Sequence, residues 1–165
     1  MGKNSPSLEM NPFYSARKTE SENNEIFASR EKASEHVRIE PTRLAKIESG
    51  KVTPYPEEVC SMAKAYNAPE LCNIYCSDYC PIGMGNVRKH DISVLDRIAF
   101  RVLGSLKDAE KLQEHIIEII EDGEITPDEY DDIDEILSAL DKITDSAQSL
   151  RLWVQKNVKE VINNG

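Results

Sequence analysis

The chain has 165 residues, of which 39% are hydrophobic and 30% are charged. This composition is typical of a folded protein with one ordinary domain, or one small domain and an extension, and it excludes wholesale disorder. No apolar run approaches the roughly 20 residues needed to cross a bilayer, and residues 1–13 lack the apolar core of a signal peptide. We therefore expect no association with a membrane and a location in the cytoplasm.

The formal net charge of −10 is distributed unevenly along the chain. Residues 1–91 carry 12 Lys and Arg against 13 Asp and Glu, whereas residues 92–165 carry 8 against 17. Within the first half, the segment 29–51 is locally basic, with six Lys and Arg against four Glu. A phosphate-facing surface is therefore compatible with segment 29–51, and the acidic second half is expected to point away from nucleic acid.

The first predicted elements are short. Residues 1–10 show no periodicity and are expected to form a disordered tail. A helix is predicted from Pro12 to about Glu20, and the polar run that ends at Glu25 is predicted to be a loop.

The locally basic segment contains two further predicted helices with a reversal between them. Ser29 is a suitable N-cap for a helix that reaches His36, and the range Val37–Glu40 is predicted to be a tight turn. A third helix is predicted over Pro41–Ser49, because proline suits the first helical position and Gly50 suits the C-terminal cap. This order of helix, tight turn and helix is compact enough to form one motif.

Proline and glycine also mark the boundaries of the next segments. A fourth helix is predicted over Pro56–Tyr66, and a short fifth turn is predicted to begin near Pro69. Residues 84–91 are predicted to be a linker, because they combine Gly85 with polar residues and show no apolar period.

The pattern changes to long helices after the linker. Apolar residues recur at spacings near three and four from Ile92 to Ile120 and again from Ile133 to Val161, as on amphipathic helices. The pair Asp122-Gly123 is predicted to stop the first helix, and Thr126–Glu129 reads as a capping box that starts the second. Residues 92–165 are therefore predicted to form a long antiparallel helical hairpin.

Two helices alone bury little apolar surface, so the hairpin is expected to dimerise or to dock a partner. A homodimer that pairs two hairpins into four helices is the simplest arrangement. We expect it to cover the apolar flanks of the two stripes, which are Phe100, Leu103, Ile117, Ile119, Leu137, Leu152 and Trp153.

A known family shares the pattern of the first half. Residues Ile47, Glu48, Gly50 and Lys51 are followed by Pro54 and by an apolar face made of Val59, Met62, Ala63 and Tyr66. With these residues, the stretch 29–71 resembles the lambda-repressor-like (Cro/repressor, or XRE) helix-turn-helix family. More narrowly, the runs 12–17, 66–71 and 75–83 look like those of a Firmicute group of such regulators found in phages and mobile elements.

The resemblance implies an all-α fold, with a five-helix lambda-repressor-like DNA-binding domain over residues 11–83 followed by the hairpin. It also implies a transcriptional regulator that binds double-stranded DNA in a sequence-specific way, with the start of the recognition helix in the major groove. On this sequence the implied contacts to base edges are Thr42, Arg43 and Lys46. The implied contacts to phosphates are Arg30, Arg38 and Lys51.

The sequence departs from the family pattern at three places. The usual glutamine at the start of the second helix is Arg30, the usual Leu-Ala pair is Ala33-Ser34, and the glycine expected in the turn is Arg38. An arginine at positive φ costs about 1 kcal/mol, which predicts some remodelling of the turn.

The cysteines are clustered at Cys60, Cys72, Cys76 and Cys80. Four thiolates can hold zinc, but protein zinc sites favour shorter Cys-x2-4-Cys spacings, and Pro81 interrupts the run. A role as small core residues is therefore favoured over a metal site or a redox pair.

No catalytic constellation is visible, and we expect neither an enzyme nor a cofactor. The histidines His36, His90 and His115 lie in separate predicted elements, and the chain has no nucleophile motif and no glycine-rich phosphate loop. Two other functions stay open. One is a protein-interaction adaptor with a degenerate helix-turn-helix, and the other is a metal- or redox-responsive regulator that uses the cysteines.

Overall fold

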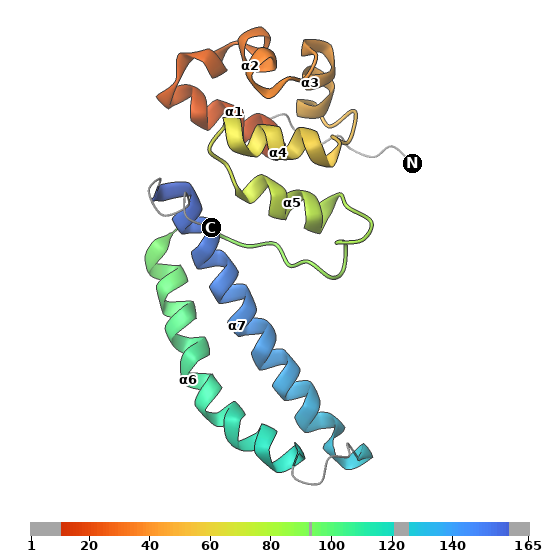
Figure 1. Cartoon of the computed structure of the whole chain (residues 1–165), viewed down its shortest axis with the longest axis vertical. Coiled ribbons are helices and arrows are strands. Elements are labelled where there is room, and N and C mark those ends of the chain that lie inside the picture. Colours follow the sequence, from red (N-terminus) through yellow and green to blue (C-terminus); the bar gives the residue numbers. More distant parts are fainter. Residues whose placement is uncertain (1–10, 93, 121–125, 159–165) are drawn as a thin grey trace. The chain divides into compact units, whose positions relative to one another are not determined.

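The structure of the chain is a computed structural model that describes residues 11–92, 94–120 and 126–158 (Figure 1). Every regular element in these ranges is a helix, which confirms the all-α prediction for the part of the chain they cover. The predicted tail 1–10 and the predicted helix stop at Asp122-Gly123 lie outside them. The chain divides into two compact units, one ending at Lys89 and one beginning at His90.

The first of these, here called the N-terminal unit, is built from short helices. They are α1 (Pro12–Asn23), the 3-10 turn η2 (Glu25–Ala28), α2 (Arg30–Val37), α3 (Pro41–Glu48), α4 (Pro56–Ala65) and α5 (Glu70–Asp78). Contacts join α1 to α3 and α5, α2 to α3 and α4, and α4 to α5. Because each helix contacts at least two others or their connecting turns, the short elements enclose one core.

Two elements of this unit are longer than predicted. The helix α1 continues to Asn23 through residues that were predicted to be a loop, and the segment after Pro69 is a full helix and not a short turn. In α5, Leu71 is buried and Tyr75 and Tyr79 pack against the core at a spacing of four residues. Tertiary packing of that apolar face stabilises a helix that its local sequence signals only weakly.

The core of the N-terminal unit contains apolar residues from every helix. Its buried members are Phe13, Phe27, Ala33, Val37, Ile39, Leu44, Ile47, Val59, Met62, Ala63, Tyr66, Ala68 and Leu71. Phe27 meets Tyr66 edge to face, with ring centres 5.3 Å apart, and Phe13 packs on Tyr79 at 5.7 Å. Aromatic pairs in these geometries add stability beyond the area they bury.

The two connections around α3 both pass through the left-handed region of backbone conformation. Arg38 has φ 56° in the turn between α2 and α3, and Gly50 has φ 69° after α3. At the first turn, the N–H groups of Arg38 and Ile39 both donate to the carbonyl of Ser34, which closes the end of α2. The predicted tight turn is therefore present, with an arginine where glycine is less strained.

The second unit, here called the C-terminal helix pair, consists of α6 (Leu95–Ile120), the 3-10 turn η3 (Pro127–Glu129) and α7 (Tyr130–Asn157). The two long helices pack along each other and run in opposite directions (Figure 1). The predicted capping box is present, because the Glu129 carboxylate accepts a 2.8 Å hydrogen bond from the backbone N–H of Thr126.

The buried apolar residues described in the helix pair are few. They are Ile98, Leu112 and Ile136, with Ile116, Ile133 and Ala139 packed against the last two. None of the helices over the described residues is both long enough and apolar enough to span a membrane.

Candidate nucleic-acid interface

The helix α3 has one buried side and one exposed side. Leu44, Ile47 and Glu48 are buried, whereas Thr42 and Lys46 are exposed. Thr42 and Lys46 are four residues apart, so they follow each other along one face of the helix. Arg43 lies at the edge of that face and is half-buried. The residues predicted to contact base edges therefore lie together, on the side of α3 that faces away from the core.

The first turn of α3 is capped by Glu40, a residue that was predicted only as the end of the preceding turn. The carboxylate of Glu40 accepts hydrogen bonds from the backbone N–H groups of Thr42 at 2.9 Å and Arg43 at 2.8 Å. These hydrogen bonds hold the pKa of Glu40 below its usual range. Because this carboxylate occupies the free N–H groups, the first turn of α3 offers side chains and not backbone amides to a ligand.

A buried ion pair fixes the other end of α3 to α1. The Arg17 guanidinium donates to Glu48 from Nε at 2.6 Å and from Nη2 at 3.0 Å, and its Nη1 donates to the carbonyl of Phe27 at 2.8 Å. The Glu48 side chain is 0% exposed. Burial by itself lowers the pKa of Arg17, but the hydrogen bonds and the charge of Glu48 raise it above the usual arginine value. This bidentate pair keeps α3 at a fixed orientation.

Arg30 takes part in the same network. Its Nε donates to Glu48 Oε2 at 2.8 Å, and its side chain is 36% exposed. Arg30 was predicted to contact a phosphate, and the structure gives it a bond to a buried carboxylate. Only the exposed part of the Arg30 side chain can therefore contact an external anion. The sequence signal for this network is a glutamate among the apolar residues that end α3, but nothing in the sequence shows that Arg17 and Arg30 are its partners.

Arg43 also has a partner inside the unit. Its Nε and Nη2 donate to the two carboxylate oxygens of Glu58 on α4, with 2.7 Å between Nη2 and Oε2. The guanidinium carbon lies 4.3 Å from the centre of the Tyr55 ring. Hydrogen bonding to Arg43 lowers the pKa of Glu58, and the same bonds raise the pKa of Arg43. No local sequence pattern indicates that Glu58 and Tyr55 contact Arg43, because they lie in the next helix and its approach.

The two remaining predicted cations lie on either side of α3 along the chain. Arg38 is exposed in the turn before α3, and Lys51 is exposed just after Gly50. The backbone N–H of Lys51 donates to the carbonyl of Lys46 at 2.9 Å, so the chain stays close to the end of α3 as it leaves the helix. Arg38, Thr42, Lys46 and Lys51 are thus all exposed on α3 or its flanking turns.

The cysteines are not the set of buried core residues that we favoured. Cys60 is exposed, and the other three are half-buried free thiols, of which Cys72 packs against the core. Burial raises the pKa of Cys72 to about 11, with smaller contributions from Cys60, which hydrogen-bonds to it, and from Cys76. Within the described ranges, no three His, Cys, Asp or Glu side chains are grouped so that they could hold a metal ion.

Comparisons of the chain with protein-family models, with curated protein sequences and with solved structures found no match.

Proposed function

We propose that this protein is a sequence-specific, double-stranded-DNA-binding transcriptional regulator, and that residues 11–83 form a lambda-repressor-like helix-turn-helix domain. The observation that carries the proposal is the placement of α3. A tight turn separates it from α2, the buried Arg17–Glu48 pair holds it, and it exposes Thr42 and Lys46 beside Arg43. A rigid helix with exposed polar side chains along one face has the shape and chemistry to read a major groove.

Different residues have different tasks in this proposal. Thr42, Arg43 and Lys46 read base edges, whereas Arg38 and Lys51 hold phosphates on either side of the groove. Arg30 contributes to phosphate attraction only through the part of its side chain that Glu48 leaves exposed. The segment 29–51 is locally basic although the whole chain is acidic, which favours binding through this face.

The test is a selection of duplexes from a random-sequence library by the full-length protein, followed by electrophoretic shift measurements at two salt concentrations. We expect one sequence to be enriched and its affinity to fall steeply with salt. Lys46→Ala should weaken binding to the selected duplex. The matched control is Lys64→Ala, because Lys64 is also an exposed lysine in the last turn of a helix. If no sequence is enriched, the proposal is wrong and the adaptor function takes its place.

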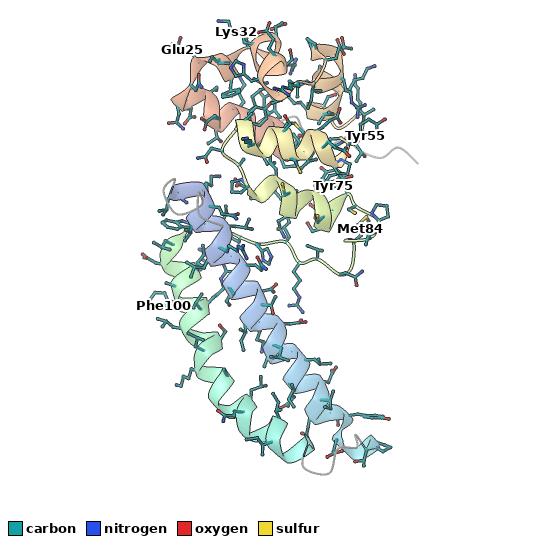
Figure 2. The ribbon with its side chains drawn as sticks, viewed as in Figure 1. Glu25, Lys32, Tyr55, Tyr75, Met84 and Phe100 are labelled. Carbon is teal, nitrogen blue, oxygen red and sulfur yellow. The ribbon has the colours of Figure 1, made fainter. Side chains whose placement is uncertain are left out.

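We also propose that the protein is a homodimer formed through the C-terminal helix pair. Large apolar side chains of the pair are exposed on both helices, namely Leu95, Phe100, Leu103, Leu106 and Ile117 of α6 and Tyr130, Leu137 and Leu140 of α7. Figure 2 shows Phe100 projecting from α6 away from α7. The predicted flanks Leu152 and Trp153 are instead half-buried, and Ile119 lies outside the described side chains.

The positions of the exposed residues on α6 follow a pattern. At about 100° per residue, Leu95, Leu103, Leu106 and Ile117 fall within an arc of roughly 80°, which is separated by about 60° from the arc that contains Ile98 and Leu112. An apolar strip of this length next to an existing core is what a second copy would cover. A twofold dimer would also present two α3 helices to half-sites about 34–36 Å apart.

The oligomeric state is tested by sedimentation velocity of the full-length protein at several concentrations. We expect a dimer at micromolar concentration. A monomer at all concentrations would exclude the homodimer without affecting the proposal for α3, because a monomer can still bind one half-site.

A further inference from the structure

The guanidinium of Arg43 is held along one edge and on one face by residues of α4 and its approach. Glu58 accepts from Nε and Nη2, and the ring of Tyr55 lies 4.3 Å from the guanidinium carbon. Glu58 is itself fixed, because its Oε2 also accepts a 2.7 Å hydrogen bond from the backbone N–H of Tyr55. Figure 2 shows Tyr55 at the start of α4, where the chain arrives from α3. The three residues form one small unit that joins two helices.

In this arrangement one edge of the guanidinium donates hydrogen bonds within the unit, and another edge stays available to a ligand. Glu58 takes the edge formed by Nε and Nη2. Nη1 and the second hydrogen of Nη2 form the end of the side chain, and they make no hydrogen bond to any residue in the described part of the chain. That end presents two parallel N–H groups, which match the O6 and N7 acceptors of guanine in the major groove.

We propose that Glu58 and Tyr55 are positioning residues that set the preference of Arg43 for guanine at one base pair. This inference rests on the proposed function. An arginine that is already held in one conformation loses little side-chain entropy on binding, so its geometric match to guanine is not diluted by other conformations. The contacts with Glu58 and Tyr55 therefore hold the Arg43 guanidinium in an orientation that suits one base.

The charge of Glu58 has a second consequence. It offsets the charge of Arg43 at the start of α3, so Arg43 paired with Glu58 adds little to the general attraction for phosphates. Removing the carboxylate frees an uncompensated guanidinium. The expected result is therefore a split between two quantities: affinity for random DNA rises, while discrimination at one base pair falls. A pair that only fastened α3 to α4 would instead lower the affinity for every duplex together.

The experiment uses the full-length protein and the duplex enriched by selection. Dissociation constants are measured for that duplex, for each single base-pair replacement of it and for random DNA. Wild type is compared with Glu58→Gln, with Arg43→Ala and with the double variant. Glu57→Gln is the matched control, because Glu57 lies in the same first turn of α4, is exposed and carries the same charge. Thermal unfolding of each variant shows that it is folded.

We expect Glu58→Gln to reduce discrimination against replacement of one G·C pair by about 10-fold, with the other positions unchanged. Arg43→Ala should lose discrimination at the same pair, and the double variant should lose no more, because both residues act through one contact. Glu57→Gln should leave that discrimination intact.

The inference is overturned if Glu58→Gln keeps the full preference for guanine, or if it weakens all duplexes equally. Both outcomes leave the proposed function standing, because the wild-type protein still selects a sequence. If the wild-type protein selects no sequence, the proposed function and this inference fail together.

Discussion

The N-terminal unit and the C-terminal helix pair treat their apolar and charged side chains differently. In the N-terminal unit, short helices surround a continuous core, and even buried charges have partners, as in the pair between Arg17 and Glu48. In the helix pair, two much longer helices bury few of the apolar residues that the structure describes and leave Phe100, Leu103 and Ile117 more than half exposed. A core is thus closed in one unit, whereas the other leaves large apolar side chains exposed on both of its long helices.

The net charge also differs between the two units. The first half of the chain is close to neutral and has six of its 12 Lys and Arg in the segment 29–51, whereas residues 92–165 carry 17 acidic against 8 basic residues. The locally basic segment 29–51 and the strongly acidic stretch therefore lie in different units of the chain. Variants in each unit test this difference between the two units.

The largest effect is expected from Glu48→Gln. This change leaves the buried guanidinium of Arg17 without its counter-charge, so the N-terminal unit should lose about 3–5 kcal/mol of stability. The single tryptophan of the chain, Trp153, lies in α7, so its fluorescence follows the unfolding of the helix pair. We expect circular dichroism to show that the N-terminal unit unfolds earlier than in the wild type. The unfolding transition of Trp153 fluorescence should not shift.

The control for this experiment is Glu57→Gln, which removes an exposed carboxylate from the same unit. It should change stability by less than about 0.5 kcal/mol. Equal shifts of the circular dichroism and fluorescence transitions in Glu48→Gln would contradict the view that the two units are stabilised separately.

The next effect concerns self-association. Replacing both Leu103 and Leu137 by Asp puts two charges on the exposed apolar surface of the helix pair, and each leucine is worth about 1.5–3 kcal/mol when fully buried. The dimer dissociation constant measured by sedimentation should therefore rise by about 100-fold or more. Ser138→Asp adds a charge at an exposed neighbour of Leu137 and should leave the dissociation constant within a few-fold. A double variant that dimerises like the wild type would place the contact elsewhere.

A smaller effect is expected at the turn before α3. Arg38 has φ 56°, so Arg38→Gly should relieve strain and stabilise the N-terminal unit by about 0.5–1 kcal/mol in urea unfolding. Gly50→Ala provides the opposite case, because its φ of 69° strains any side chain although there is space for a Cβ. It should destabilise the unit by about 1 kcal/mol. Two changes of the same sign would show that strain does not govern these turns.

The smallest effect is a pH dependence of the helix pair. Burial lowers the pKa of His90 below 6.5, and the nearby Arg101 lowers it further, while Asp145 opposes both. The unfolded chain then takes up a proton more readily than the folded chain, so stability is complete above pH 6.5 and falls as the pH drops below it. The midpoint of unfolding followed by Trp153 fluorescence should therefore be lower at pH 5.5 than at pH 7.5.

The variant His90→Gln should reduce this difference, since it removes the titrating group. His36→Gln changes an exposed histidine of the N-terminal unit and should leave the pH dependence of Trp153 fluorescence unchanged. The role of His90 would be excluded if His90→Gln retained the full pH dependence.

Features that depend on neighbouring residues in the chain could be predicted before the structure was known. Proline at the start of α3, glycine after its end and the capping box before α7 were all predicted, because helix boundaries depend on backbone groups a few residues away. The long helices were predicted from their apolar period. The sequence also placed Thr42 and Lys46 on one face of a helix, since their spacing alone decides that.

The internal partners of the charged residues depend instead on how the helices pack. Arg17 and Glu48 are 31 residues apart, and Arg43 and Glu58 are 15 apart, so no local rule connects them. Packing also decided the length of α5, because the pattern of its own residues is weak. A hydrogen bond or a core contact between distant segments forms only once the helices are packed, and in this unit that packing pairs Arg43 with Glu58 and Arg30 with Glu48.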